Sequence, residues 1–467
     1  MKRIYPLLFH IFIILLIGVK AYPVELYITG NRLSVHANNE HLRDILQLLA
    51  DQGITVHADP EINPLVSVNF KNREMEQGLS ALFRNLNYIL LWKAIDTPLG
   101  QFVRLDEVHL FLPGRKELTK ILAPNTRKLA ENPKDGSLFI KNEILIRLSN
   151  KIDLTDFKKF ISDNGLIVSG YNRYAGIIEI TLPENSDYFA MLELISMYPG
   201  IKRAEPNYAY PIDHPFFLSG SPPNTLKNRI FAGSANTVPI AVIDSGLAGD
   251  YQSAPYIYAS FNSIDPDEPV SDSLGHGTQM AMIAGGAVRP VGTGDSVDYL
   301  NPVIAIKGFD ENGYISNFDL LNGIEFAVNN RARILSLSWG SETKSEFLEQ
   351  TFDYAASKGL IILGAAGNEP SGNNMYPAAY SSVIGVGALD PQGKRWDKSN
   401  YGDFVNIYAP GFASLPVGYN GEPGTYAGTS ISTAFVANLI AGYLSKHPDA
   451  SIKEILTSLA DKAQDQK

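Results

Sequence analysis

Beyond residue 238 the chain alternates between short apolar runs and longer segments in which apolar residues recur at helical spacing. The runs contain few polar positions, as expected of strands buried on both faces of a parallel sheet. The helix-sized segments between them fit crossover helices that connect parallel strands. The runs are PIAVIDSG, PVIAIKG, ARILSLSWG, GLIILGAAGNE and SVIGVGAL. Residues 238–467 are therefore predicted to form a doubly wound α/β domain with a mostly parallel sheet.

Residues 138–211 show a different pattern, in which strands alternate with two helices. The expected strands are 138–148, 166–174, 176–182 and 201–210, and the expected helices are 155–165 and 186–200. This βαββαβ order is that of a ferredoxin-type α+β domain. The segment contains no histidine, no carboxylate pair at a useful spacing and no glycine loop ahead of a helix. Its residues therefore predict a fold but no chemistry.

A third pattern, over residues 22–112, predicts another small α+β domain. One helix places Leu42, Ile45, Leu46 and Leu49 on a single face, and a second helix spans residues 74–86. Strands are expected at 33–37, 54–58, 65–70, 88–92 and 103–112. Residues 113–137 and 212–237 are rich in proline, glycine and polar residues, so we predict that they are linkers.

The first 21 residues have the order of features found in a secretory signal peptide. A basic start precedes an apolar run from Leu7 to Val19, and a small residue, Ala21, stands at the expected cleavage position. The run is short for a membrane span, although an uncleaved N-terminal anchor is the alternative. We therefore expect an exported protein, secreted or periplasmic, that has lost residues 1–21.

Composition narrows the chemistry further. The 467-residue chain has a formal net charge of −10, which argues against nucleic acid as a partner. It contains no cysteine, so a thiol nucleophile and a cysteine-ligated metal are both excluded. No Asp-rich loop has the spacing of a calcium site. We expect no required cofactor or metal, with calcium binding left open.

Four polar residues occupy places in the last domain where ligands gather, beyond the carboxyl ends of strands or beside glycines. Asp244 ends the run PIAVI, His276 lies between two glycines, Asn368 follows GLIILGAAG, and Ser430 lies in GTSIS. Taken singly, the aspartate, asparagine and serine are typical turn or capping residues. Only one other histidine, His447, lies in this domain, in a polar turn near its end. His276 is therefore the expected base if Ser430 is a nucleophile.

Together the four residues fill the roles of a serine hydrolase. A serine hydroxyl needs a base, a carboxylate that orients the base, and donors for the oxyanion. The chain order Asp, His, Ser is one of three known triad orders and belongs to the subtilisin type. An α/β-hydrolase would need GxSxG at the serine and a histidine after it, and the local text here is GTSIS.

Residues 238–460 resemble the subtilase family of serine proteases through four ordered motifs, AVIDSG, GHGT, GAAGNE and GTSISTA. The resemblance implies that Asp244 orients the base His276 and that Ser430 is the nucleophile. It also implies that Asn368, with the Ser430 amide and support from Thr429, forms the oxyanion hole. It places Ser338, Trp339 and Gly340 on one wall of a substrate cleft, Ala365, Ala366 and Gly367 on the other, and Tyr314 and Ile315 on an edge strand ending at Ser316.

Three departures from the family pattern accompany this resemblance. Ile315 lies near a position where the family often has a glycine, and Asn438 stands where a glycine would let helices approach closely. The residues after the serine are Ile-Ser-Thr-Ala, where the family usually has Met-Ala and then a proline. None of these changes touches the four catalytic groups. Side-chain preference stays open, with Met375 or a neighbour at the floor of the primary pocket.

The α+β domain over residues 138–211 resembles a subtilase propeptide, because it lies directly upstream and ends in AEPNYAY. The resemblance implies a domain that assists folding and occupies the cleft in cis until it is cut away. Cleavage is expected between Tyr208 and His214. A permanent regulatory domain is the alternative.

The run from Leu33 to Trp92 resembles the short N-terminal module found ahead of secretins and TonB-dependent receptors. The resemblance implies that residues 22–112 dock on a protein of the bacterial envelope. A spacer or folding aid is the alternative.

The sequence thus predicts an exported serine endopeptidase, made as a zymogen, that hydrolyses protein or peptide substrates through an acyl-enzyme on Ser430. Two other functions stay open at this point. One is a docking protein of the envelope whose protease domain is inactive, and the other is a serine esterase that uses the same site.

Overall fold

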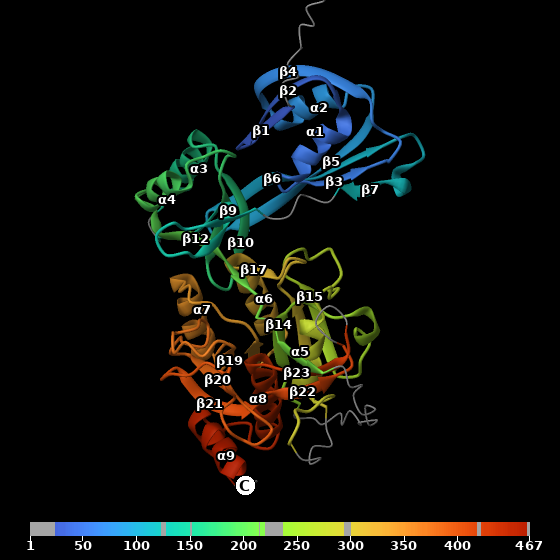
Figure 1. The fold of residues 1–467 in the computed structure, drawn as a ribbon. Helices are drawn as coiled ribbons and strands as arrows, with labels where there is room; N and C mark the ends of the chain where they lie inside the picture. Colours follow the sequence, from blue (N-terminus) through green and yellow to red (C-terminus); the bar gives the residue numbers. More distant parts are fainter. Residues whose placement is uncertain are drawn as a thin grey trace, which may run out of the picture. The chain divides into compact units, whose positions relative to one another are not determined.

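The computed structural model describes residues 24–122, 128–149, 152–213, 215–219, 237–293, 300–417 and 422–464. The chain divides into two compact units, one made of residues 1–93 and 105–126 and the other of residues 94–104 and 127–467. Figure 1 shows the elements of both units. The predicted signal peptide lies outside the described residues.

The first unit contains two sheets and two helices, except for residues 94–104 of one hairpin, which belong to the second unit. An antiparallel sheet has the strand order β1 (Glu25–Thr29), β2 (Arg32–His41), β4 (Leu65–Glu74). The other sheet has the order β5 (Asn87–Thr97), β6 (Gly100–Phe111), β3 (Thr55–Ala58), β7 (Lys120–Leu122). Helices α1 (Leu42–Ala50) and α2 (Met75–Leu82) bury their apolar faces, and α1 does so through the four predicted residues. The structure confirms the predicted elements of this segment and adds β1 and β7.

In the second unit, residues 138–211 fold in the predicted βαββαβ order. The elements are β9 (Leu138–Leu148), α3 (Leu154–Asp163), β10 (Ile167–Asn172), β11 (Ile177–Thr181), α4 (Tyr188–Ser196) and β12 (Ile201–Pro211). Asp153 and Asp187 start the two helices by accepting bonds from backbone N–H groups that have no partner within the helix. The strand order is β10-β11-β9-β12, and β17 (Tyr314–Ser316) of the last domain extends it beyond β12. The sheet therefore joins the two domains.

The two segments predicted to be linkers contain short strands. Residues 113–137 include η1 (Lys116–Leu118), β7, which pairs with β3, and β8 (Leu129–Glu131), which pairs with β9. Residues 212–237 include β13 (Phe216–Ser219), which pairs with β23 (Gly424–Ala427). Strands of three or four residues are too short to show a period, and their partners lie far away in the sequence. Residues 220–236 lie outside the described part of the chain.

A seven-stranded parallel sheet forms the centre of the last domain, as predicted (Figure 1). Its order is β15 (Ile257–Asn262), β16 (Val303–Lys307), β14 (Ile240–Asp244), β18 (Ile334–Leu337), β19 (Ile361–Ala365), β20 (Val383–Leu389), β21 (Val405–Pro410). Along β14, Ile240 and Val242 pack into one core and Ala241 and Ile243 into the other. Since side chains alternate along a strand, both faces of the sheet are buried, which accounts for the continuous apolar runs.

Four helices cover this sheet. The residues of α5 (His276–Ala284) and α8 (Thr429–Leu444) belong to the core on one face, and those of α6 (Asn317–Asn329) and α7 (Glu346–Ser357) to the core on the other. Helix α9 (Ile452–Gln464) packs through Ile455 and Leu459 into the first of these cores. None of the helices in the described ranges has the length and hydropathy needed to cross a membrane.

The structure accounts for Asn438, one of the departures from the family pattern. Its side-chain Nδ2 donates to the carbonyl of Ala284, the last residue of α5, at 2.9 Å. Carbonyls in the last turn of a helix have no partner within the helix. The asparagine therefore joins α8 to the end of α5 through a hydrogen bond in place of a close glycine contact.

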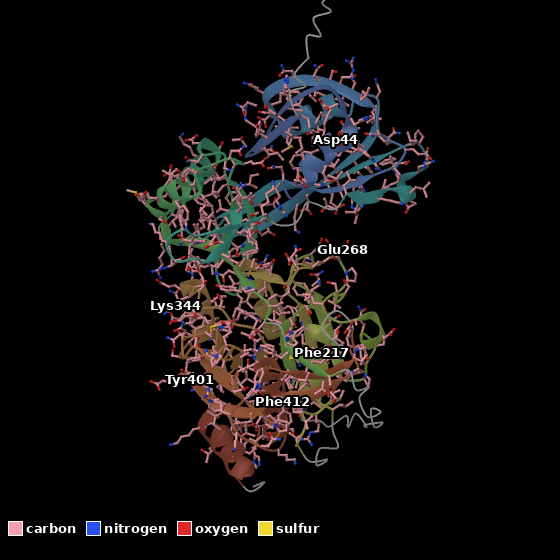
Figure 2. All side chains as sticks on the ribbon, viewed as in Figure 1. Asp44, Phe217, Glu268, Lys344, Tyr401 and Phe412 are labelled. Atoms are coloured by element: carbon pink, nitrogen blue, oxygen red, sulfur yellow. The ribbon has the colours of Figure 1, made fainter. Side chains whose placement is uncertain are left out.

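A small antiparallel sheet leads the chain into α8. Its order is β13, β23, β22 (Phe412–Leu415), and Phe217 of β13 packs against Tyr426 of β23 with ring centroids 5.4 Å apart. Phe217 and Phe412 are labelled in Figure 2. Strand β23 ends one residue before Gly428, which caps α8. This sheet therefore fixes the backbone that enters the helix carrying Ser430.

Candidate active site

Asp244 and His276 form a buried hydrogen-bonded pair at the carboxyl end of the central strand β14. His276 Nδ1 lies 2.7 Å from Asp244 Oδ1, and the backbone N–H of Ser245 donates to the same oxygen at 2.8 Å. Both side chains are almost completely excluded from solvent. Because a carboxylate only accepts, Nδ1 carries the proton and Nε2 presents its lone pair.

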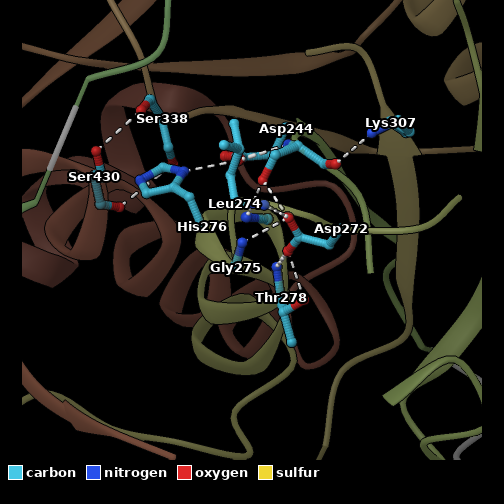
Figure 3. Close-up of polar contacts among 11 residues, drawn as sticks. Asp244, Asp272, Leu274, Gly275, His276, Thr278, Lys307, Ser338 and Ser430 are labelled. Atoms are coloured by element: carbon cyan, nitrogen blue, oxygen red, sulfur yellow. Dashed lines mark hydrogen bonds and ion pairs between the residues drawn. The ribbon is translucent and has the colours of Figure 1, made fainter. Parts of the chain in front are cut away.

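Asp272, which the sequence analysis did not single out, holds the start of α5 that carries His276 (Figure 3). Its Oδ1 accepts from Gly275 N at 2.7 Å and from Ser245 Oγ at 2.9 Å. Its Oδ2 accepts from the N–H and the hydroxyl of Thr278 at 2.9 and 2.6 Å. An aspartate four residues ahead of a histidine at a helix start is the signal that could have identified it, since helix N-termini favour carboxylates.

The environment of His276 favours its protonated form. Burial by itself would lower the pKa of this imidazole, but the Asp244 carboxylate opposes burial through its charge and its hydrogen bond. Asp272 and Asp213 add further negative charge, and the net result is a pKa above the usual value for histidine. The site is therefore suited to accept a proton.

Ser430 is the second residue of α8 and does not cap that helix. The capping position belongs to Gly428, and no side chain caps the helix. Ser430 Oγ donates to the carbonyl of Ser338 at 2.9 Å. His276 Nε2 has no hydrogen-bond partner within the described residues, so the bond between imidazole and serine hydroxyl is not formed.

Figure 3 nevertheless shows the imidazole between Ser430 and Asp244, with the serine beside the ring edge that faces away from the aspartate. Rotation about the Cα–Cβ bond of Ser430 is the motion that turns its hydroxyl from the Ser338 carbonyl toward the ring. Catalytic hydrogen bonds are often unformed in structures without substrate.

Asn368 follows the end of β19 and is held by Thr429 at the start of α8. The backbone N–H and the hydroxyl of Thr429 donate to Asn368 Oδ1 at 2.9 and 3.2 Å. Because Thr429 holds the amide oxygen, Nδ2 points away from Thr429 and donates to Asp213 Oδ2 at 2.9 Å. The Asn368 side chain therefore presents a donor of fixed orientation.

The expected walls of the cleft lie on neighbouring strands. Ser338, Trp339 and Gly340 follow β18, while Ala365, Ala366 and Gly367 follow or end its parallel neighbour β19. Trp339, Ala365 and Ala366 have buried side chains. A Cβ placed on Gly340 would meet Met375 at 3.4 Å and the Ala365 carbonyl at 3.6 Å, and a Cβ on Gly367 would meet Met375 at 3.4 Å. Met375 thus lies beside a glycine of each expected wall.

The edge strand β17 is paired with residues of β12 in the manner of a bound peptide. Ala209, Tyr210 and Pro211 face Ser316, Ile315 and Tyr314 in antiparallel register. The pairing continues as the Ile212 N–H donates to the Gly313 carbonyl at 2.8 Å. Ile315 itself is turned inward, and its side chain occupies the space that a Cβ on Gly308 would need. The substitution at Ile315 therefore leaves the edge strand able to pair.

Tyr210, Asp213 and Glu205 carry side chains from this segment into the last domain, and none was singled out as a site residue in the sequence analysis. The Tyr210 ring stacks on Trp339 at 5.1 Å between centroids, and its hydroxyl donates to Asn317 Oδ1 at 2.8 Å. Burial raises the pKa of Asp213 to about 6, although His276 and the Asn368 hydrogen bond oppose the rise. Long-range contacts of this kind leave no periodic signal in the sequence.

Glu205 lies at the amino-terminal end of α7. It accepts a hydrogen bond from the hydroxyl of Ser345, which caps that helix, and one from the Phe347 N–H at 3.4 Å. Burial raises the pKa of Glu205 to about 7, against the lowering effect of these hydrogen bonds. The propeptide-like domain therefore places a buried carboxyl at a helix terminus of the last domain.

Comparisons with known proteins agree with this geometry. Residues 235–467 match the model of the subtilase family. The chain is 31% identical to subtilisin of Bacillus pumilus, covering 53% of this chain and 91% of that protein. It is 32% identical to a thermostable alkaline protease of Halalkalibacterium halodurans, covering 56% of this chain and 72% of that protein.

Two further comparisons extend beyond the last domain. The match to subtilisin NAT of Bacillus subtilis subsp. natto has 29% identity and covers 65% of this chain and 80% of that protein. The matched part of the chain is longer than residues 235–467, so it includes part of the domain upstream of them.

The fold is also similar to that of fervidolysin from Fervidobacterium pennivorans, with a TM-score of 0.54 and 22% identity. Fervidolysin is described as a keratinolytic enzyme related to subtilisin. That match covers 68% of this chain and 57% of the fervidolysin chain. Together with the family match and the subtilisin relatives, these observations show that the chain belongs to the subtilase family and that residues 235–467 are its subtilisin-like serine endopeptidase domain.

Proposed function

We propose that the chain hydrolyses peptide bonds through an acyl-enzyme on Ser430, with His276 as the base and Asp244 as the orienting carboxylate. The observation that supports this most strongly is the buried 2.7 Å contact between Asp244 and the Nδ1 side of His276. It leaves Nε2 to take the proton of Ser430 as the hydroxyl attacks the substrate carbonyl. The resulting imidazolium then gives its proton to the leaving amine, and water repeats the sequence on the acyl-enzyme.

The oxyanion hole of this proposal consists of Asn368 Nδ2 and the backbone N–H of Ser430. The bonds from Thr429 to Asn368 Oδ1 support it, because they orient the amide before substrate arrives. Donors that are already oriented stabilise the tetrahedral intermediate without reorganisation. The Ser430 N–H also lies in the first turn of α8, where the helix dipole favours negative charge.

We further propose that the chain is made as a zymogen and that residues 138–213 are its propeptide. The strand pairing of 209–211 with β17 and the bond from Ile212 to Gly313 support this, because they occupy the edge where substrate backbone would pair. The match to subtilisin NAT, which extends upstream of residue 235, also supports it. We assign maturation to the peptide bond that follows Asp213.

The carboxylate of Asp213, not its backbone carbonyl, accepts from Asn368 Nδ2. In this arrangement the proposed oxyanion donor is occupied by a side chain that cannot be attacked productively. The bond after Asp213 can be cut only once its carbonyl has replaced the carboxylate. The zymogen is therefore inhibited both by occupation of the cleft and by capture of the Asn368 donor.

Export of the chain, with residues 1–21 as its signal peptide, and docking of residues 22–112 on an envelope protein remain proposals from the sequence. No metal is needed for the proposed reaction, and calcium binding stays an open prediction.

The decisive experiment compares the chain with its Ser430→Ala variant on a casein-like protein and on matched amide and ester peptides. We expect protein and amide hydrolysis by the parent and none by the variant. Equal and negligible turnover in both would favour the inactive docking protein. Ester hydrolysis without amide hydrolysis would favour the esterase.

A further inference from the structure

His57, Glu107 and His109 form a compact cluster in the first unit. One ligand atom from each residue lies within 4.8 Å of the other two. Glu107 Oε2 lies 2.5 Å from Nε2 of His109 and 3.7 Å from Nε2 of His57. The two imidazole rings are stacked, with centroids 4.2 Å apart and planes inclined by 2°. Both ring edges therefore face the same carboxylate.

The sheet register brings these residues together. Strands β3 and β6 are parallel neighbours (Figure 1). In their register His57 pairs with His109. Glu107 lies two residues before His109 on β6, so the two side chains point to the same face of the sheet. Each ligand is thus carried by a strand of a hydrogen-bonded sheet and not by a mobile loop.

The ligand types and their spacing fit a transition metal. Two imidazoles and one carboxylate are typical zinc ligands, whereas magnesium and calcium prefer oxygen alone. Tetrahedral bonds of about 2.1 Å to zinc place neighbouring ligand atoms about 3.4 Å apart. The 2.5 and 3.7 Å separations lie on either side of that value. The ion would replace the proton shared by His109 and Glu107, and the stacked rings would have to tilt until both Nε2 lone pairs point at it.

The cluster is also reachable from solvent. The relative solvent exposure of the side chains is 21% for His57, 14% for His109 and 28% for Glu107. They are buried enough to be held by their neighbours and open enough for an ion to enter. Three protein ligands leave one position of a tetrahedral ion for water.

We propose that His57, Glu107 and His109 bind one zinc ion or a similar divalent transition metal. This site belongs to the first unit and takes no part in the hydrolytic chemistry proposed for Ser430. It gives the N-terminal module a ligand of its own.

The test titrates zinc chloride into the full chain carrying Ser430→Ala, a change that prevents self-cleavage, after treatment with a chelator. Calorimetry should show one zinc ion per chain. His57→Gln and His109→Gln should each weaken binding at least tenfold, because each removes a ligand. His41→Gln, an exposed histidine on β2 of the same unit, is the matched control and should bind as the parent does. Absence of stoichiometric zinc in the parent, or unchanged affinity in the cluster variants, would overturn the proposal.

A second measurement covers the case in which the variants fail to fold, as judged by circular dichroism. X-ray absorption of the intact protein loaded with one equivalent of zinc should show scattering from two imidazoles in the first coordination shell. A shell made of oxygen ligands alone would contradict the assignment.

Discussion

The orientation of the Asn368 amide is determined by its neighbours. Thr429 binds its oxygen through two donors, so only the nitrogen is available to a substrate. Asn368 and Thr429 are 61 positions apart in the sequence, and the fold brings the end of β19 next to the start of α8. The hydroxyl and the N–H of one threonine therefore set the orientation of the Asn368 amide.

Asn368→Ala should lower kcat by about 10²- to 10³-fold with little change in KM, because the donor acts on the oxyanion and not on the bound substrate. Initial rates over a range of peptide concentrations measure both constants. Thr429→Ser, which keeps the hydroxyl and the N–H, is the control and should retain most of the activity. A loss expressed in KM alone would mean that Asn368 serves substrate binding.

Met375 is predicted to restrict the primary pocket to small side chains, because it contacts both walls near Gly340 and Gly367. Met375→Gly removes that side chain and should raise kcat/KM for a peptide with phenylalanine before the cut bond, relative to alanine, at least tenfold. Val291→Gly, at an exposed apolar residue of the last domain, should leave the ratio unchanged. The same ratio in Met375→Gly and the parent would remove Met375 from the pocket.

At the scale of elements, β12 has two roles, since it completes the sheet of its own domain on one edge and pairs with β17 on the other. Its last residues continue to Asp213, whose carboxylate holds the Asn368 amide. Hydrogen bonds to charged groups contribute about 1.5 to 3 kcal/mol. If the chain is a zymogen, as proposed, a single carboxylate at the end of the strand is enough to delay its maturation.

Removal of that carboxylate should accelerate self-cleavage. Asp213→Ala is expected to shorten the half-time of conversion from precursor to mature enzyme by roughly tenfold, as the cost of leaving Asn368 is removed. Asp213→Asn removes the charge but keeps the size of the side chain. Its half-time of conversion should fall between those of the parent and Asp213→Ala. Gel electrophoresis over time gives the rates, and Asp163→Ala, at an exposed aspartate, is the control. Slower conversion of Asp213→Ala would contradict the proposed inhibition.

Periodic elements could be predicted from the sequence, and contacts between distant residues could not. The strand β9 has the predicted bounds because its apolar alternation extends over eleven residues. By contrast β7, β8 and β13 have three or four residues each and form through their partners. The motif residues Asp244, His276, Asn368 and Ser430 were identified from their surroundings in the sequence. Asp272 and Glu205 were not, because their roles depend on partners that only the fold brings near.

At the scale of the whole molecule, the chain combines a subtilase domain, a propeptide-like domain that shares a sheet edge with it, and a separate N-terminal unit. Contact between the first two includes two buried acids, Glu205 and Asp213. Their raised pKa values, about 7 and about 6, link this contact to pH. Stabilisation from a carboxyl with a raised pKa is fully present below its ordinary value and is lost as the pH rises through the raised one.

Glu205 should therefore stabilise the precursor at pH 5 and destabilise it, relative to a neutral side chain, at pH 8. In a Ser430→Ala background, Glu205→Gln should shrink the difference in unfolding free energy between these pH values by about 2 to 3 kcal/mol, since one pKa unit corresponds to about 1.4 kcal/mol. Denaturant titrations at both pH values provide the measurement. Glu193→Gln, at an exposed position of α4, should leave the difference as it is. An equal pH dependence in Glu205→Gln and the parent would show that Glu205 ionises freely in the precursor.

Labelling with a fluorophosphonate reports whether His276 activates Ser430, because such reagents modify serines that a base has activated. Mass spectrometry of the labelled mature protein should find the adduct on Ser430 and none on Ser432, which lies two residues further along α8. His276→Ala cannot mature itself and is first cleaved by a trace of the active parent; it should then carry no adduct beyond that trace, while His447→Ala should be labelled as the parent is. Labelling of Ser430 that persists in His276→Ala, or no labelling in the mature parent, would mean that His276 does not activate Ser430.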